Sequence, residues 1–263
     1  IRVVERKEYL EHLIQWKDEQ VIKVVTGIRR CGKSTLLLQY QEWLKASGVS
    51  DEQIVTINFE ELEYEELQDY KKLYAYLKNR LCKGKMTYIF LDEIQKVSAF
   101  EKVVDSLYVK PQVDLYVTGS NAFLLSADLA TLFTGRYIEI HVFPFSFQEY
   151  CKYYDNVTDK DKLFDEYSFK GGLAGSYAYP NDRDRITYIK EVYETIVTRD
   201  LVQKYALSDT TVLQRLSEFL MDNISNLTSP NKVSQLLNAN DIATSHVTVG
   251  KYIKYLCNAF VFY

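Results

Sequence analysis

Short apolar runs alternate with longer amphipathic stretches through the first half of the chain. The apolar runs predict β-strands at 21–26, 54–59, 88–91, 113–117 and 137–142. The stretches around them predict helices at 5–19, 33–47, 66–82, 98–109 and 122–133. Strands joined by helices favour a parallel sheet with right-handed crossovers and helices on both faces. The first half therefore predicts an α/β fold.

The second half reads as helices alone. Apolar positions at helical spacing predict helices at 163–169, 188–205, 211–224, 233–237 and 247–261. A further helix is predicted to start at Ser146, because Ser146 and Glu149 have the spacing of a capping box. The chain turns polar near residue 155, so we expect an α/β domain over 1–155 and an all-α domain over 156–263.

The last helices of the chain have the order of a helix-turn-helix or winged helix, namely a short helix, a turn and a longer helix. In this interpretation the recognition helix opens with Ser245, His246, Thr248 and Lys251. The alternative is a small helical module that packs against protein. The pattern favours neither, so the segment 228–263 is a candidate contact for DNA or for a protein partner.

The most specific stretch of the chain follows the first predicted strand. It reads Gly27-Ile28-Arg29-Arg30-Cys31-Gly32-Lys33-Ser34-Thr35 and fits the phosphate-binding pattern GxxxxGK[ST]. Backbone N–H groups of such a loop converge on an anion at a helix N-terminus, Lys33 faces the outer phosphates, and Ser34 offers a hydroxyl to Mg²⁺. All nine residues are therefore predicted to bind nucleotide. Because Cys31 lies inside this cradle, we expect its oxidation or alkylation to block nucleotide access.

A second informative stretch is Tyr88-Ile89-Phe90-Leu91-Asp92-Glu93. Its apolar residues suit a strand buried on both faces, and Asp92 and Glu93 would then lie at the carboxyl end, where open α/β sheets bind ligands. Asp92 is predicted to hold Mg²⁺ together with Ser34. Glu93 is predicted to polarise the attacking water.

Two further positions are weaker candidates for catalytic roles. Ser120 and Asn121 follow the fourth predicted strand, where either could sense the γ-phosphate, cap the next helix or do both. Arg136 is interpreted either as an arginine finger, which stabilises charge on the transferred phosphoryl group, or as part of a structural salt bridge.

Composition narrows the choice of partners. The net charge of −4 gives no general attraction to nucleic acid, so any DNA contact must depend on a local patch such as Lys232, Lys251 and Lys254. The four cysteines lack CxxC spacing, which argues for a reducing compartment and against a zinc site. No apolar run approaches the roughly 20 residues needed to cross a bilayer. We therefore expect a cytoplasmic protein without a membrane partner.

Taken together, these motifs resemble the AAA-type P-loop ATPases of bacteria and archaea that carry a C-terminal helical and winged-helix domain of unknown function. The resemblance rests on the phosphate-binding stretch and, in order, on Tyr-Ile-Phe-Leu-Asp-Glu-Ile-Gln, Val-Thr-Gly-Ser-Asn, Thr-Gly-Arg-Tyr and Pro-Phe-Ser-Phe-Gln-Glu-Tyr. It implies an AAA-like core in which Lys33, Ser34, Asp92 and Glu93 have the roles given above, Ser120 or Asn121 is the sensor, and Arg136 is a candidate finger. Such proteins usually continue into a restriction-endonuclease-like region, which in a longer protein would follow Tyr263. No second-sensor arginine stands out in the helical half.

The sequence therefore predicts Mg²⁺-dependent binding and hydrolysis of ATP to ADP. The nucleotide state would be coupled to a helical domain that contacts DNA, a protein partner or another copy of the chain. The alternatives are a slow nucleotide-dependent protein-interaction switch without DNA binding, and a phosphotransferase. A GTPase is disfavoured, because Asp92 is followed by Glu93-Ile94-Gln95 rather than by the Asp-x-x-Gly pattern.

Overall fold

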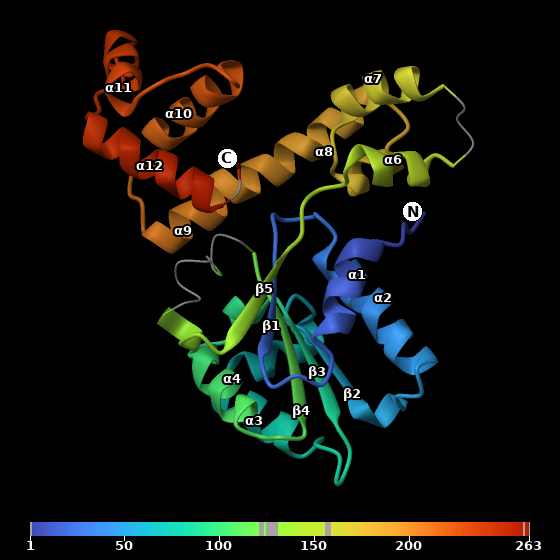
Figure 1. The fold of residues 1–263 in the computed structure, drawn as a ribbon. Helices are drawn as coiled ribbons and strands as arrows, with labels where there is room; N and C mark the ends of the chain where they lie inside the picture. The colour runs from blue at the N-terminus through green and yellow to red at the C-terminus, as the bar shows by residue number, and fades with distance from the viewer. Residues whose placement is uncertain (1, 121–123, 125–130, 156–158, 260, 263) are drawn as a thin grey trace.

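A five-stranded parallel sheet forms the centre of the first half. The computed structural model describes residues 2–120, 124, 131–155, 159–259, 261 and 262. The strands are β1 Ile22–Thr26, β2 Ile54–Asn58, β3 Thr87–Asp92, β4 Val113–Thr118 and β5 Tyr137–His141. Their order is β2-β3-β4-β1-β5, and each neighbouring pair is parallel (Figure 1). The predicted strands and the predicted parallel sheet are confirmed.

Helices cover both faces of the sheet. They are α1 Lys7–Gln15, α2 Lys33–Ala46, α3 Tyr70–Lys78 and α4 Phe100–Tyr108. Side chains of α1 and α2 share a core with Phe90, whereas those of α3 and α4 share a core with the next residue, Leu91. Successive strand residues point to opposite faces, so a strand covered on both sides needs a continuous apolar run. This explains why the run at 88–91 is a strand.

The second half is built from helices. They are α6 Phe147–Tyr153, α7 Lys160–Lys170, α8 Asp182–Glu194, α9 Leu201–Tyr205, α10 Thr211–Asp222, α11 Pro230–Ala239 and α12 His246–Asn258. A π-helix, Thr195–Asp200, joins α8 to α9. Short 3-10 helices lie at Asp51–Gln53, Leu62–Gln68, Ile94–Lys96 and Ala174–Ala178. We call the part from α7 to α12 the helical region.

Helix boundaries differ from the prediction where the first turn is polar. Helix α8 begins six residues before the predicted start at 188, because Asn181 caps it by accepting a hydrogen bond from the Asp184 backbone N–H. Helix α11 is longer than the predicted 233–237, because Ser229 caps it and Pro230 suits its first turn. Capping residues, rather than apolar spacing, set these helix starts.

Two sequence-based expectations stay predictions. The helix expected at 122–133 lies largely outside the described residues, of which only 131–133 are helical in that range. The domain boundary at 155 falls between α6 and α7, which pack together with the rings of Tyr150 and Tyr167 5.3 Å apart. The predicted capping box that starts α6 is present, with Ser146 and Glu149 as its members.

The helical region lies beyond the carboxyl ends of the strands (Figure 1). It has its own core, which includes Val197, Leu213, Leu216 and Val249. Ile28, which follows β1, packs against this core and also against the core under α1 and α2. The segment between β1 and α2 is therefore in contact with both halves of the molecule. No helix in the described part of the chain is both long and apolar enough to span a bilayer.

A buried ion pair lies within the sheet, on the face that α1 and α2 cover. Lys23 of β1 donates to Asp114 of β4 at 2.5 Å, and neither side chain is exposed to solvent. Asp114 also accepts hydrogen bonds from the Tyr116 hydroxyl and from the Asp18 backbone, each at 2.9 Å. The Tyr116 hydroxyl is in turn 2.7 Å from that of Tyr40. This network ties β1 to β4 and α2.

Replacing Lys23 by methionine should cost about 3–5 kcal/mol of the free energy of unfolding, because it leaves the Asp114 carboxylate buried without a countercharge. Urea denaturation would measure the loss. The control is Lys7→Met, which removes the exposed pair with Glu11 and should change stability little. Equal effects of the two substitutions would contradict the assigned importance of the buried pair.

Candidate nucleotide site

The phosphate loop, residues 27–35, runs from the end of β1 into the start of α2. Gly27 has φ +149°, and a Cβ there would overlap the carbonyl oxygen of Val142. Gly32 has φ +101° and is the N-cap of α2. The first turn of α2 contains no acidic residue, and no side chain caps it. Its N–H groups are therefore available to an anion, as the sequence predicts.

The side chain of Lys33 reaches back to the start of the phosphate loop. Its side chain is 5% exposed, and its Nζ donates to the carbonyl oxygens of Gly27 at 2.9 Å and Ile28 at 3.2 Å. Ser34 and Thr35 are exposed at the start of α2. The loop thus presents one ammonium group, two hydroxyls and a helix N-terminus on the same side of the sheet.

Asp92 and Glu93 lie at the carboxyl end of β3, as predicted, and both are buried. The Thr118 hydroxyl at the end of β4 donates to Asp92 Oδ1 and accepts from the Glu93 backbone N–H at 3.1 Å. Glu93 itself has φ +58°, which is unfavourable for a residue with a side chain and is typical of functional positions. The sequence pattern gave no role to Thr118, because only Ser120 and Asn121 were considered as functional residues after this strand.

The Glu93 carboxyl is in an environment that suits a general base. Burial raises its pKa above the ordinary value for glutamic acid, partly offset by the positive charge of Lys33 and a hydrogen bond from Gln95. A carboxylate with a raised pKa accepts a proton more readily than a solvated one. Glu93 and Lys33 line the same cavity, which has a volume of about 320 Å³.

The two sensor candidates are only partly described. Ser120 is buried, and its hydroxyl has no hydrogen-bond partner among the residues that the structure describes. Asn121 lies outside the described residues. Their role as sensors therefore stays a prediction.

Arg136 lies at the amino ends of the strands, whereas the phosphate loop lies at their carboxyl ends. It precedes Tyr137, which pairs with Ile22 at the start of β1, whereas the loop follows the end of β1. Its guanidinium pairs with Asp105 at 3.3 Å and lies over the ring of Tyr108. Within its own chain Arg136 therefore cannot reach a phosphate on the loop. Arg136 thus forms the salt bridge of the alternative interpretation, and its role as an arginine finger stays a prediction.

Arg6 is a site residue that sequence reasoning missed. It is 3% exposed, and its guanidinium donates to the carbonyl oxygen of Cys31 at 3.0 Å and to the Glu149 carboxylate at 2.7 and 3.0 Å. Although burial alone would raise the pKa of Glu149, hydrogen bonds from Arg6 and Ser146 hold that pKa below its ordinary value. The pair joins the N-terminal segment, the phosphate loop and α6. Only the capping-box glutamate gave any signal in the sequence.

Cys31 is buried, contrary to the expectation of an accessible thiol. Its side chain packs with Val25 and Leu36 under α1 and α2. Burial also raises the pKa of the thiol, so little thiolate forms at neutral pH. Cys31 therefore contributes its backbone to the loop, while its sulfur belongs to the core.

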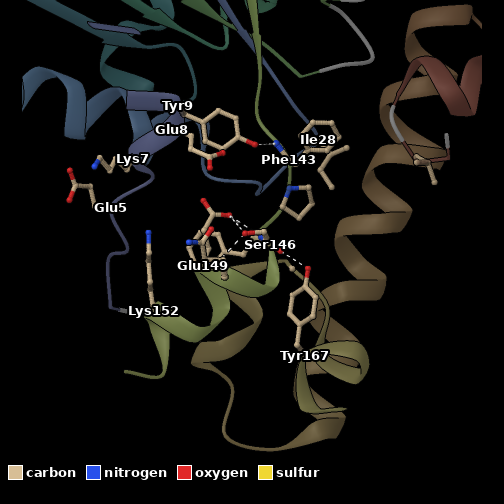
Figure 2. Close-up of a pocket in the computed structure, with 15 residues that line it drawn as sticks. Glu5, Lys7, Glu8, Tyr9, Ile28, Phe143, Ser146, Glu149, Lys152 and Tyr167 are labelled. Carbon is tan, nitrogen blue, oxygen red and sulfur yellow. Dashed lines mark hydrogen bonds between the residues drawn. The ribbon is translucent and has the colours of Figure 1, made fainter. Parts of the chain in front are cut away.

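The cavity that contains the phosphate loop is smaller than a neighbouring cavity. Its walls include the loop, Val3 and Val4 of the N-terminal segment, and Gly175 and Tyr188 of the helical region. A hollow of about 700 Å³ lies next to it, between α1 and α6, and Figure 2 shows Tyr9 and Glu149 on its walls. Because Arg6 lines the smaller cavity and Glu149 the larger, their ion pair lies between the two. The smaller cavity is the candidate nucleotide site, because it contains the loop, Lys33 and Glu93.

The candidate ligands of Mg²⁺ are Ser34 at the start of α2 and Asp92 at the end of β3. No cluster of three or more histidine, cysteine, aspartate or glutamate residues in the described ranges could hold a metal ion by itself. Ser34 supplies a hydroxyl and Asp92 a carboxylate, both hard oxygen ligands. Mg²⁺ commonly takes one or two such ligands and completes its shell with phosphate and water.

Comparison with protein families matches most of the chain. An AAA domain matches residues 19–151, and a domain of unknown function (DUF8612) matches residues 161–263. An uncharacterized protein of Haemophilus influenzae is 38% identical over 266 residues, which cover 99% of this chain and 66% of that protein. The uncharacterized protein MJ1544 of Methanocaldococcus jannaschii is 25% identical over 257 residues, or 92% of this chain and 56% of that protein. The chain thus spans less than two thirds of the length of these relatives.

Among solved structures, the Walker-type ATPase PABY2304 of Pyrococcus abyssi has a similar fold. The TM-score is 0.60 over 98% of this chain and 90% of that chain, with 15% sequence identity. At this level of identity the likeness concerns the fold. It extends across both halves of the molecule.

The burial of Cys31 predicts that its thiol reacts last of the four cysteines. Iodoacetamide should label the partly exposed Cys82 and Cys151 in the folded protein, and Cys31 only after unfolding. Peptide mass spectrometry at increasing times and urea concentrations would measure this order. Labelling of Cys31 in the folded protein at the rate of Cys82 would contradict the buried position.

Proposed function

We propose that this chain, which belongs to the AAA domain family, binds ATP with Mg²⁺ at the phosphate loop and hydrolyses it to ADP. The observation that supports this most is the shared cavity of Lys33 and Glu93. A phosphate-binding ammonium group and a buried carboxylate at the carboxyl edge of one sheet are the groups that water attack on a γ-phosphate requires.

Each residue of the site would have a distinct role in hydrolysis. Backbone N–H groups of the loop and of α2 would bind the phosphate oxygens, and Lys33 would neutralise their charge. Ser34 and Asp92 would hold Mg²⁺, which when bound offsets the charge of the phosphates. Glu93 would take a proton from the attacking water, and Thr118 would keep Asp92 and the Glu93 backbone in place through its hydroxyl.

The nucleotide base would lie in the part of the cavity away from Lys33 and Glu93. Val3 and Val4 form one wall and Tyr188 another. A Cβ at Gly175 would overlap the Tyr188 hydroxyl, so a glycine at this position leaves room for the tyrosine. Apolar and aromatic walls suit a flat heterocycle such as adenine.

Two other activities use the same groups. In a slow nucleotide switch, the hydrogen bond from Gln95 would keep Glu93 from activating water. In a phosphotransferase, an acceptor hydroxyl would replace the water. Phosphate release from ATP without an added acceptor distinguishes hydrolysis from transfer, and the turnover number distinguishes an enzyme from a slow switch.

We also propose that the helical region contacts DNA through α12. Helix α11, a turn and α12 have the order of a helix-turn-helix, and both pack on α10. Val247, Lys251 and Lys254 are exposed at positions that share one face of α12. The alternative is a protein partner or a second copy of the chain, supported by Ile224 and Leu227, which are 68% and 98% exposed.

Lys33→Ala should abolish ATP binding, whereas Glu93→Gln should bind ATP and lose about 10²–10⁴-fold in turnover, because it keeps the shape of the site without the base. Isothermal titration calorimetry and phosphate release measure the two effects. The control is Glu66→Gln, which neutralises an exposed glutamate on the surface. Turnover like that of the wild type in Glu93→Gln would remove Glu93 from its role.

The pH profile gives a second readout of Glu93. Because the pKa of Glu93 is raised, its carboxylate is lost at a higher pH than that of a solvated glutamate, so turnover should fall as the pH drops through that raised value. An acid limb at the ordinary pKa of glutamic acid would contradict the assignment.

DNA binding by α12 should show in a gel shift at low salt and weaken in the double variant Lys251→Gln/Lys254→Gln. Losing two phosphate contacts should also make the plot of log K against log salt concentration less steep by about 2. Lys7→Gln, which changes α1, serves as the control. Absence of a shift at low salt, with and without ATP, would exclude DNA in favour of a protein partner.

A further inference from the structure

A carboxylate from the helical region binds a side chain of the phosphate loop. Arg29 donates from Nε to Asp200 Oδ2 at 2.6 Å and from Nη2 to Asp200 Oδ1 at 3.0 Å. The two residues are 171 positions apart in the chain. A planar guanidinium that meets both oxygens of a carboxylate fixes direction as well as distance. The pair therefore sets how the loop and the helical region meet.

The Asp200 carboxylate is buried and needs the positive charge of Arg29. Its side chain is 2% exposed, and it is the last residue of the π-helix between α8 and α9. Single turns of π-helix inside longer helices are frequent at functional sites. A carboxylate this deeply buried is costly to leave without a countercharge. Loss of Arg29 from the pair would therefore weaken the contact between the π-helix and the phosphate loop.

Arg29 is also part of the candidate nucleotide site. It lines the cavity that contains Lys33 and Glu93, and its Nη1 is 3.4 Å from Glu60 Oε1. The hydrogen bonds that Arg29 donates to Asp200 raise the pKa of the Arg29 guanidinium, so its positive charge is retained throughout the working range of pH. A guanidinium binds phosphate with the same two-pronged geometry with which it binds carboxylate.

We propose that the terminal phosphate of a bound triphosphate competes with Asp200 for the guanidinium of Arg29, and so loosens the contact between the phosphate loop and the helical region. This inference rests on the proposed function. Ile28, the preceding residue, packs on the core of the helical region, so a shift of this part of the loop also reaches that core. A diphosphate lacks the terminal group and leaves the pair in place.

The competition has a reciprocal consequence, because two equilibria that share one side chain must be linked. If the phosphate weakens the Arg29–Asp200 pair, then removing the pair must strengthen binding of the phosphate. A purely structural pair predicts the opposite sign, because its loss would only disturb the loop. The sign of the change in affinity therefore separates the two roles.

The test is the affinity of Asp200→Asn for the non-hydrolysable analogue AMPPCP with Mg²⁺, measured by calorimetry. We expect binding to tighten by about fivefold or more, the lower end of typical allosteric couplings, with little change for ADP. In the Arg29→Gln background the same Asp200→Asn substitution should have no effect on affinity. The matched control is Asp182→Asn, which removes an ion pair with the buried Arg185 elsewhere on α8 and should leave nucleotide affinity unchanged.

A second measurement uses the wild-type chain and does not depend on the folding of a variant. Amide hydrogen exchange in residues 195–205 should speed up with Mg²⁺ and AMPPCP but not with ADP. Equal or weaker AMPPCP binding by Asp200→Asn, or exchange that is the same with both nucleotides, would overturn the competition. Failure of the wild type to bind either nucleotide would instead overturn the proposed function.

Discussion

The close approach of the Gly27 backbone to the carbonyl of Val142 is the constraint on which the site depends. Any side chain at Gly27 would overlap that carbonyl, so β1 and the end of β5 meet at this point only because residue 27 has none. The loop can then turn directly into α2 and carry its N–H groups to the carboxyl edge of the sheet. Asp92, Glu93 and Thr118 reach the same edge because parallel strands end together.

The loop is held at three points by distant parts of the chain. Arg6 of the N-terminal segment bonds to the Cys31 carbonyl, Ile28 packs on the core of the helical region, and Arg29 pairs with Asp200. These contacts explain how a short loop with positive φ at Gly27, Arg30 and Gly32 has a defined path. They also mean that a change in the loop on binding phosphate acts on the N-terminal segment and on the helical region together.

Much of the architecture could be predicted from local pattern, because strands buried on both faces and amphipathic helices leave their period in the sequence. Lys33, Asp92 and Glu93 were predictable for a related reason, since each lies within or directly after a local motif. The pairs Arg6–Glu149 and Arg29–Asp200 were not predictable, because the partners are 143 and 171 residues apart and no local motif links one to the other. Arg136 shows the reverse case. Its position before a strand suited a catalytic role, but the direction of β5 places Arg136 at the amino ends of the strands, away from the phosphate loop.

The distribution of charge around the loop explains why Lys33 would be the first cation that a phosphate meets. Arg6 and Arg29 each donate two hydrogen bonds to a carboxylate, so much of their charge is already balanced. Lys33 instead donates to two neutral carbonyl oxygens, which balance little of its charge. An entering phosphate therefore gains most from Lys33 and the backbone N–H groups. Arg29 becomes available to it only at the cost of uncovering Asp200, and that cost gives the helical region influence over the nucleotide.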